Sequence, residues 1–309
     1  MNLQKWYIIV NPAAGKGKVN RKLPFIEKSL LSNQIFYELV KTQKSGDAIL
    51  LVKKGIENGF RNIMAIGGDG TNNEVVNGII QQDIVPSQSI TYALLSIGTG
   101  NDWIKTHGIP QNIPKFLMML KKGKTTFQDI GVVSYLNSET VQKRYFVNVA
   151  GMAYDAFVVK ETEKQSGIFS NKLFYLISLM RYLFQYKLQK AKIQVNGLEL
   201  RDYFYTINVG ICRFAGGGME IVPHAVPNDG QLAITIAGQL SKWSVILNTY
   251  RFYNGTIAKL SKISTHFSTN IKVESLENDP IFLEVDGEFL GHTPVEFGIV
   301  PKALKILIP

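Results

Sequence analysis

The sequence predicts an α/β fold, with an N-terminal doubly wound parallel sheet and a C-terminal antiparallel β-sandwich domain. Over the first third of the chain, apolar runs of strand length alternate with amphipathic stretches of helix length. This alternation is typical of a parallel sheet that helices cover on both faces. After "KKGKTTFQD" (121–129), short alternating runs separated by Asn-Gly and Asp-Gly pairs take over. Such pairs favour hairpin turns between antiparallel strands.

The first part begins with "KWYIIV" (5–10), which is almost entirely apolar and predicts a buried strand. The same reasoning gives strands at 5–10, 35–40, 61–66 and 91–97, and helices at 19–32, 45–58 and 72–81. In a sheet of this kind ligands bind beyond the carboxyl ends of the strands. Three loops rich in glycine and small polar residues are expected there: "NPAAGKGK" (11–18), "GGDGTNN" (67–73) and "IGTGND" (97–102).

The second part is predicted to consist of short strands, from "DIGVVSYL" to "KALKILI", with one helical segment at 171–190. We place the domain boundary near residue 125, which gives domains at 1–125 and 126–309. Because chain termini are often close together in compact domains, the last twelve or so residues could pack back on the first domain.

Composition narrows the function classes. The 309 residues carry a formal net charge of +10, which favours anionic partners such as nucleotide phosphates, nucleic acid or an anionic membrane. No recognition helix or RNA-binding motif supports a nucleic-acid partner. Cys212 is the single cysteine, so an intrachain disulfide is impossible and a reducing compartment is expected. The chain shows no signal peptide and no apolar run long enough to span a membrane, so we expect a soluble, cytoplasmic protein.

The loop "GGDGT" has the features of a phosphate site. A loop that leaves a strand and enters a helix directs backbone N–H groups toward an anion, and glycine lets that backbone approach closely. The alternative is a tight turn with Thr71 or Asn72 as the helix N-cap. The first loop is not a Walker A motif, because Val19 stands where Ser or Thr is needed. The second does not match G-x-G-x-x-G.

"NPAAGKG", "GGDGTNNEVVNG" and "IGTGND", in this order, resemble the diacylglycerol kinase catalytic family, which includes bacterial diacylglycerol kinases, sphingosine kinases and ceramide kinases. Later stretches match as well, among them "NVAGMAYDA" (148–156) and "VDGEF" (285–289). GGDGT is shared with NAD kinases, whereas the other two loops favour lipid kinases. The resemblance implies a nucleotide-binding domain at 1–125, a lipid-substrate domain at 126–309, ATP and Mg²⁺ as cofactors, and a lipid alcohol as acceptor.

The resemblance also implies a set of nucleotide contacts. Asp69 is the only charge within GGDGT, and it is expected to face Mg²⁺, a positive side chain or the ribose. Lys18 is a further candidate for neutralising phosphate charge, although it could equally be a solvated lysine. The expected cofactor-binding residues are Asn11, Pro12, Gly15, Lys16, Thr42, Gly67, Gly68, Gly70, Thr71, Asn72, Asn73, Thr99, Asn101 and Asp102.

In the same family the group that accepts the proton of the lipid hydroxyl lies in the Asp-x-Glu of "VDGEF". This implies a catalytic role for Asp286 or Glu288, with Asp69 as the third catalytic candidate. Without the resemblance, Asp286-Gly287 between two apolar runs predicts a type I′ hairpin turn. Both interpretations remain open at this stage.

"VPNDGQL" (226–232) resembles the family loop that holds a structural Mg²⁺. Asp229 is a hard oxygen ligand, and the carbonyls of Val226 and Gln231 could add two more. Position 226 has no side-chain oxygen, unlike some relatives, so an ordinary hairpin turn at Asn228–Gly230 is the alternative.

The segment 171–192 is apolar and aromatic, with Arg181, Lys187, Lys190 and Lys192 toward its end. Such a basic amphipathic helix can lie on an anionic membrane, although its apolar face could instead pack on a sheet. We therefore expect a lipid kinase that contacts the membrane peripherally. An exposed strand edge could also support a homodimer. The competing functions are a NAD kinase and a catalytically silent, nucleotide-responsive lipid-binding protein.

Overall fold

The computed structural model describes residues 5–98, 101–164 and 172–309. The chain divides into two compact units. The first unit ends at Asp129 and takes back the C-terminal segment Lys302–Pro309, and the second unit is Ile130–Pro301. Among the helices within the described ranges, none is long and apolar enough to cross a bilayer.

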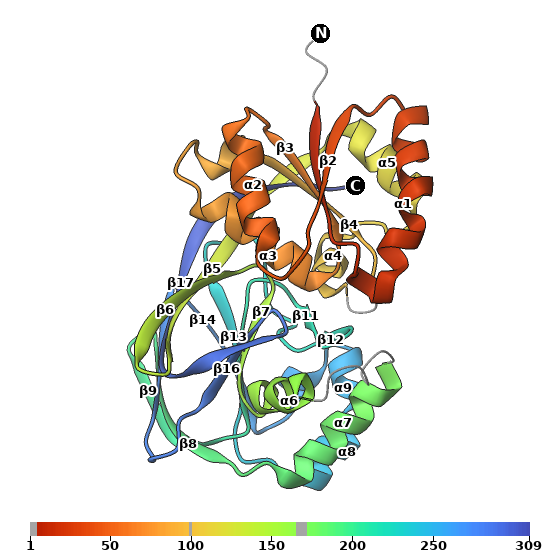
Figure 1. The fold of residues 1–309 in the computed structure, drawn as a ribbon. Coiled ribbons are helices and arrows are strands. Elements are labelled where there is room, and N and C mark those ends of the chain that lie inside the picture. The colour runs from red at the N-terminus through yellow and green to blue at the C-terminus, as the bar shows by residue number, and fades with distance from the viewer. Residues whose placement is uncertain (1–4, 99–100, 165–171) are drawn as a thin grey trace. The chain divides into compact units, whose positions relative to one another are not determined.

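The first unit is built on a parallel sheet. The strands follow the order β2-β1-β3-β4, and the end of β17 pairs with β4 through Lys305 and Ile306. Helices α2 and α3 cover one face of this sheet, and α1 and α5 cover the other (Figure 1). The elements are β1 (Trp6–Val10), α1 (Ala14–Ser32), β2 (Tyr37–Lys41), α2 (Asp47–Glu57), β3 (Asn62–Gly67), α3 (Asp69–Gln81), the 3-10 turn η1 (Ser87–Ser89), β4 (Thr91–Ser96), α4 (Asp102–His107) and α5 (Ile113–Lys122).

Local sequence explains most of these elements. Every residue of β1 is buried, as expected for a central strand of a sheet covered on both faces. Helix α2 buries Ala48, Val52 and Ile56, which recur every four residues on one face. The seven predicted strands and helices of this part are all present. Helix α3 begins at Asp69 rather than Asn72, so neither Thr71 nor Asn72 is its N-cap, which is Gly68.

The second unit is an antiparallel sheet with helices added. The strand order is β14-β13-β10-β7-β16-β17, and β17 also pairs with β5 and β15. The strands are β5 (Thr125–Asn137), β6 (Thr140–Phe146), β7 (Val149–Ala153), β8 (Gln189–Val195), β9 (Leu198–Phe204), β10 (Thr206–Gly210), β11 (Phe214–Ala215), β12 (Met219–Glu220), β13 (Leu232–Ala237), β14 (Ile263–Ser268), β15 (Asn270–Ser275), β16 (Phe282–Val285) and β17 (Glu288–Leu307), of which β5 and β17 extend into both units.

The sequence predicts a single helix in this part, and that number was wrong because the structure has more. Helix α7 (Lys172–Gln185) corresponds to it, with residue 171 outside the described ranges. Three further α-helices are α6 (Tyr154–Glu163), α8 (Lys242–Asn248) and α9 (Tyr250–Tyr253), and a 3-10 turn, η2, covers Ile257–Lys259. Helix α6 buries Tyr154, Ala156 and Val158, a spacing of two that is typical of a strand. The hydrophobic pattern of α6 therefore does not predict a helix.

Glycine sets the distance between α2 and α3. A Cβ atom at Gly78 would lie 2.8 Å from the Val52 Cβ and 2.9 Å from the Ile49 carbonyl oxygen. Replacing Gly78 with alanine should lower the free energy of unfolding by about 1–3 kcal/mol, because the two helices must move apart. Chemical denaturation measures this, with the exposed Lys53→Ala on α2 as control. Unchanged stability of Gly78→Ala would show that the helices adjust without cost.

Candidate active site

The first two glycine-rich loops are tied together at the carboxyl end of the parallel sheet. Asn11 follows β1, and its backbone N–H donates to the Ile66 carbonyl oxygen at 3.0 Å. Its side-chain Nδ2 donates to Thr71 Oγ1 at 3.1 Å, and its Oδ1 accepts from the Ala13 N–H at 3.1 Å. One asparagine side chain therefore positions both loops, which explains the residue type at this place.

Glycine at the points of contact lets the backbones of the three loops approach each other closely. Gly15 has φ +60°, and a Cβ there would lie 3.1 Å from the Ile97 carbonyl oxygen and 3.7 Å from the Gly98 Cα. A Cβ at Gly98 would in turn lie 3.8 Å from the Gly68 Cα. The loops thus line one edge of the sheet with bare backbone, next to the first turn of α3. This is the arrangement that backbone N–H groups need to bind phosphate.

Asp69 has a structural function that the sequence did not reveal. Its Oδ2 accepts from the backbone N–H of Asn101 at 2.7 Å. Asn101 is buried with φ +55°, and its Nδ2 donates to the Gly98 carbonyl oxygen at 2.9 Å. Asp69 therefore holds the third loop against the second, in addition to any interaction with Mg²⁺ or the nucleotide.

The remaining predicted nucleotide contacts have different surroundings. Lys16 and Lys18 are exposed, and the Thr42 N–H donates to the Val10 carbonyl oxygen at 2.9 Å. Asp102 forms a 2.6 Å ion pair with Lys105 inside α4. Pro12 is half-buried, Gly67 is the last residue of β3, Gly70 lies in the first turn of α3, and Thr99 is outside the described residues.

Asn72 and Asn73 are both 1% exposed, and they have partners in the interior of the unit. Asn72 Oδ1 accepts from the Tyr92 hydroxyl at 2.7 Å, and Asn73 Oδ1 accepts from Asn77 Nδ2 at 3.1 Å. These bonds attach α3 to β4 and stabilise its first turns. A nucleotide contact for either residue remains a prediction.

The loop that contains Asn101 and Asp102 is anchored by a buried cluster that sequence reasoning missed. Gln128 Oε1 accepts from Trp103 Nε1 at 2.9 Å and lies 2.8 Å from His107 Nε2. Burial lowers the pKa of His107 to about 4. The imidazole is therefore neutral at physiological pH and packs on the Trp103 ring.

In the second unit, Asp286 and Gly287 form the predicted type I′ turn, with φ of +50° and +87°. The Asp286 carboxylate accepts from the backbone N–H groups of Val147, Asn148 and Val149 at 3.1, 3.0 and 3.2 Å. Asp286 thus connects the turn to the chain before β7. A carboxylate has further lone pairs, so this role is compatible with accepting a proton.

Glu288 follows the turn and, like Asp286, is half-buried. Its Oε2 lies 3.0 Å from Arg144 Nη2, and its side chain is 38% exposed. The Arg144 guanidinium can neutralise the carboxylate and orient it.

The predicted metal loop folds as a turn around Asp229. The Asp229 Oδ1 accepts from the Gln231 N–H at 3.0 Å, and Gly230 has φ +78°. The Val226 side chain is 40% exposed. Within the described ranges there is no cluster of three or more His, Cys, Asp or Glu residues that could hold a metal ion. One carboxylate already engaged by an N–H is a weak fit to Mg²⁺, so the metal site stays a prediction.

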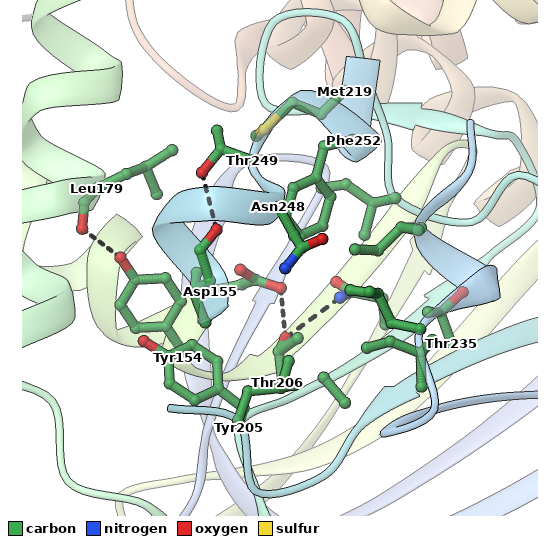
Figure 2. Close-up of a pocket in the computed structure, with 18 of the residues that line it drawn as sticks. Tyr154, Asp155, Leu179, Tyr205, Thr206, Met219, Thr235, Asn248, Thr249 and Phe252 are labelled. Atoms are coloured by element: carbon green, nitrogen blue, oxygen red, sulfur yellow. Dashed lines mark hydrogen bonds between the residues drawn. The ribbon is translucent and has the colours of Figure 1, made fainter. Parts of the chain in front are cut away.

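A pocket in the second unit combines apolar walls with a small polar end (Figure 2). Its cavity volume is about 80 Å³. Its walls come from α7, α8, α9 and the sheet, and they include Leu179, Leu183, Met219, Val245, Phe252 and Ile257. The lining suits a ligand group that is mostly apolar.

Asp155 lies at the polar end of this pocket, and sequence reasoning did not single it out. It accepts from the Thr206 hydroxyl at 2.5 Å, and Asn208 Nδ2 donates to the same hydroxyl at 3.2 Å. The hydroxyls of Tyr205 and Thr235 also line the pocket, and both are buried without a hydrogen-bond partner among the described residues. Such orphan groups are available to a polar part of a ligand. The stretch "NVAGMAYDA" (148–156) could have indicated Asp155, because it is a carboxylate within an otherwise apolar run.

Glu284 is a buried carboxylate beside the half-buried Asp155. Its Oε2 accepts from the Gly287 N–H at 2.8 Å. A Cβ at Gly151 would lie 2.5 Å from Glu284 Oε1 and 3.0 Å from the Asp155 Cβ, so glycine leaves room for the pair. Burial raises the pKa of Glu284 well above its usual value, and the charges of Asp155 and Asp286 raise it further. Burial also raises the pKa of Asp155.

Glu284→Gln should change the pH dependence of stability. A carboxyl whose pKa is raised in the folded state stabilises the fold below its unfolded pKa, and this contribution is lost as pH rises through the folded pKa. The unchanged protein should lose this contribution between pH 5 and pH 8. We therefore expect the unfolding temperature of Glu284→Gln, measured relative to that of the unchanged protein, to rise over this range. The exposed Glu139→Gln should track the unchanged protein. A constant difference across this range would contradict the shift.

Comparison with known proteins agrees with this geometry. Residues 5–133 match the model of the diacylglycerol kinase catalytic domain, and residues 148–308 match the YegS C-terminal NAD kinase beta sandwich-like domain. A diacylglycerol kinase of Staphylococcus carnosus is 27% identical over 98% of this chain and 94% of its own length. A protein of Enterobacter named "Probable lipid kinase YegS-like" is 25% identical over 96% and 94%.

Solved structures share the fold. A diacylglycerol kinase from Bacillus anthracis superposes with a TM-score of 0.73 at 21% identity, over 100% of this chain and 98% of that one. Yeast NADH kinase superposes with a TM-score of 0.54 at 11% identity, over 99% and 84%. The predicted fold class and family resemblance are confirmed. The chain belongs to the family that has the YegS C-terminal NAD kinase beta sandwich-like domain, here preceded by a diacylglycerol kinase catalytic domain, and it is a phosphotransferase with an alcohol group as acceptor.

Proposed function

We propose that this protein is an ATP-dependent lipid kinase that transfers the γ-phosphate to the hydroxyl of a lipid such as diacylglycerol, or of a sphingoid or other lipid alcohol. The observation that carries this proposal is the apolar pocket of the second unit with Asp155 at its polar end. A lipid presents that combination of a long apolar part and a small polar group.

The ATP part of the proposal rests on the glycine-rich loops of the first unit. Their backbone approaches without Cβ atoms in between, and α3 begins within the second loop. A helix N-terminus and bare N–H groups favour phosphate oxygens. Mg²⁺, when bound with ATP, would neutralise phosphate charge, and the Asp69 carboxylate at this loop is the residue whose donor chemistry fits it.

In the proposed reaction the lipid hydroxyl oxygen attacks the γ-phosphorus, and the bond from that phosphorus to the oxygen bridging it to the β-phosphate breaks. ADP leaves, and the hydroxyl proton passes to the carboxylate of Asp286 or Glu288. Asp286 is oriented by three backbone N–H groups and Glu288 by Arg144. Asp155 would orient the polar part of the acceptor.

The acceptor can be identified with γ-labelled ATP, Mg²⁺ and a total lipid extract in mixed micelles, followed by mass spectrometry of the labelled product. We expect a phosphorylated lipid alcohol, with diacylglycerol the first to test because relatives carry that name. A parallel incubation with NAD separates the NAD kinase alternative, since labelled NADP and unlabelled lipid would overturn the proposal. ATP binding without any labelled product would indicate a catalytically silent protein.

Asp286→Asn and Glu288→Gln should separate the two candidate bases. Loss of the group that accepts the proton should lower kcat about 100- to 10,000-fold. Asp286→Asn should also lower thermal stability, because an amide N–H₂ would replace an oxygen that accepts backbone N–H groups. Glu288→Gln should leave stability nearly unchanged. Full turnover in both variants would remove this turn from the chemistry.

Narrowing the pocket should affect the lipid and not the nucleotide. Val245 lines the pocket from α8, whereas its neighbour Ile246 does not. We expect Val245→Trp to raise the KM for the lipid at least about tenfold, since the bulky ring displaces a matching part of the acceptor. The KM for ATP should not change. Ile246→Trp is the matched control, and equal lipid kinetics in both variants would place the acceptor elsewhere.

A further inference from the structure

We infer that the outer face of α7, α8 and α9 is a docking surface for an anionic lipid bilayer, which we call the aromatic face. Its exposed apolar residues are Ile177 and Phe184 on α7, Trp243 and Leu247 on α8, and Tyr250 and Tyr253 on α9. The inference deepens the proposed function, because it assigns the surface through which a lipid kinase would reach its acceptor.

Direct contacts join α7 and α8 within the aromatic face. The rings of Phe184 and Trp243 lie 6.3 Å apart, and Lys242 Nζ donates to the Phe184 carbonyl oxygen at 2.7 Å. Trp243 and Leu247 are four residues apart on one helix and therefore share a side of α8. Tyr250 follows one turn later, with the Arg251 guanidinium 5.4 Å from its ring centre.

These helices are apolar on two sides, which is unusual for a helix at a protein surface. Their inner sides line the pocket through Leu179 and Leu183 on α7, Val245 on α8 and Phe252 on α9. A helix that covers a core normally turns polar residues to water. Here Trp243 is 67% exposed and Leu247 is 73% exposed, so the outer side requires an apolar neighbour of its own.

The positive charge around the aromatic face indicates what this apolar partner is. Segments 172–192 and 238–262 contain nine Lys and Arg residues and no Asp or Glu. Among them Lys242 and Arg251 lie beside the exposed aromatic rings, and Arg181 and Lys187 are exposed at the end of α7. Trp and Tyr prefer the interface between lipid headgroups and acyl chains, and cations near such a surface bind anionic headgroups.

Tryptophan fluorescence tests this inference directly, because Trp6 and Trp103 are 8% and 1% exposed whereas Trp243 is 67% exposed. The intact protein is mixed with phosphatidylglycerol–phosphatidylcholine vesicles, without ATP or acceptor. We expect a blue shift of the emission and quenching by brominated acyl chains. Binding measured by co-sedimentation should weaken with salt and be much weaker on pure phosphatidylcholine.

Trp243→Ala/Leu247→Ala should lower the affinity for these vesicles at least about tenfold, in line with the loss of two buried apolar side chains. Val141→Ala/Leu50→Ala is the matched control, since both residues are more than two-thirds exposed, at 72% and 70%, on other elements. Lys187→Glu/Lys242→Glu should reduce both the affinity and its salt dependence.

Vesicle binding that survives both the apolar and the charge-reversal variants would overturn the inference. So would an emission shift that follows protein concentration and not lipid, because that result would assign the face to a second copy of the chain. These measurements involve no phosphoryl transfer. Their failure would therefore leave the proposed kinase activity standing, and absence of labelled product would leave the docking surface standing.

Discussion

Close approach of bare backbone is the constraint on which the candidate nucleotide site depends. A Cβ at Gly67 would lie 2.4 Å from Thr71 Oγ1, and one at Gly15 would lie 3.1 Å from the Ile97 carbonyl oxygen. Side chains at these positions would separate the loops and interrupt the hydrogen bond from Asn11 to Thr71. The strand ends, the start of α3 and the left-handed backbone of Gly15–Gly17 are all arranged around this contact.

The polar residues of both units combine structural and chemical functions. Asp69 holds Asn101, Asp286 holds three backbone N–H groups, and Glu284 caps the turn that contains Asp286. A residue that orients backbone in this way is itself held rigidly, and rigid placement is what phosphoryl transfer requires of its charged groups. Structural bonds at these carboxylates therefore do not argue against catalysis.

The second unit places two carboxylates next to apolar surface. Glu284 is buried and Asp155 is half-buried, and removal from water raises the pKa of each carboxyl. Their neighbour Gly151 leaves the space that the pair occupies. Around them α7, α8 and α9 line the pocket with one side and expose aromatic rings on the other. A lipid acceptor and a lipid surface would account for the two sides of the same helices.

The sequence by itself determined β1 to β4, the three helices that connect them and the three loops at the sheet edge, because hydrophobic periodicity and glycine clusters are local signals. It also determined the Asp286-Gly287 turn, since Asp-Gly favours φ > 0 at both central residues. It missed α4 and α5 in the first unit and α6, α8 and α9 in the second. Helix α6 buries residues with a spacing of two, and α4, α8 and α9 are only six, seven and four residues long. Only the tertiary structure decided that Asp155 and Glu284 are neighbours, since they are far apart in the chain and meet through the pairing of β7 with β16. Contacts of that kind depend on which strands pair, and no local pattern encodes them.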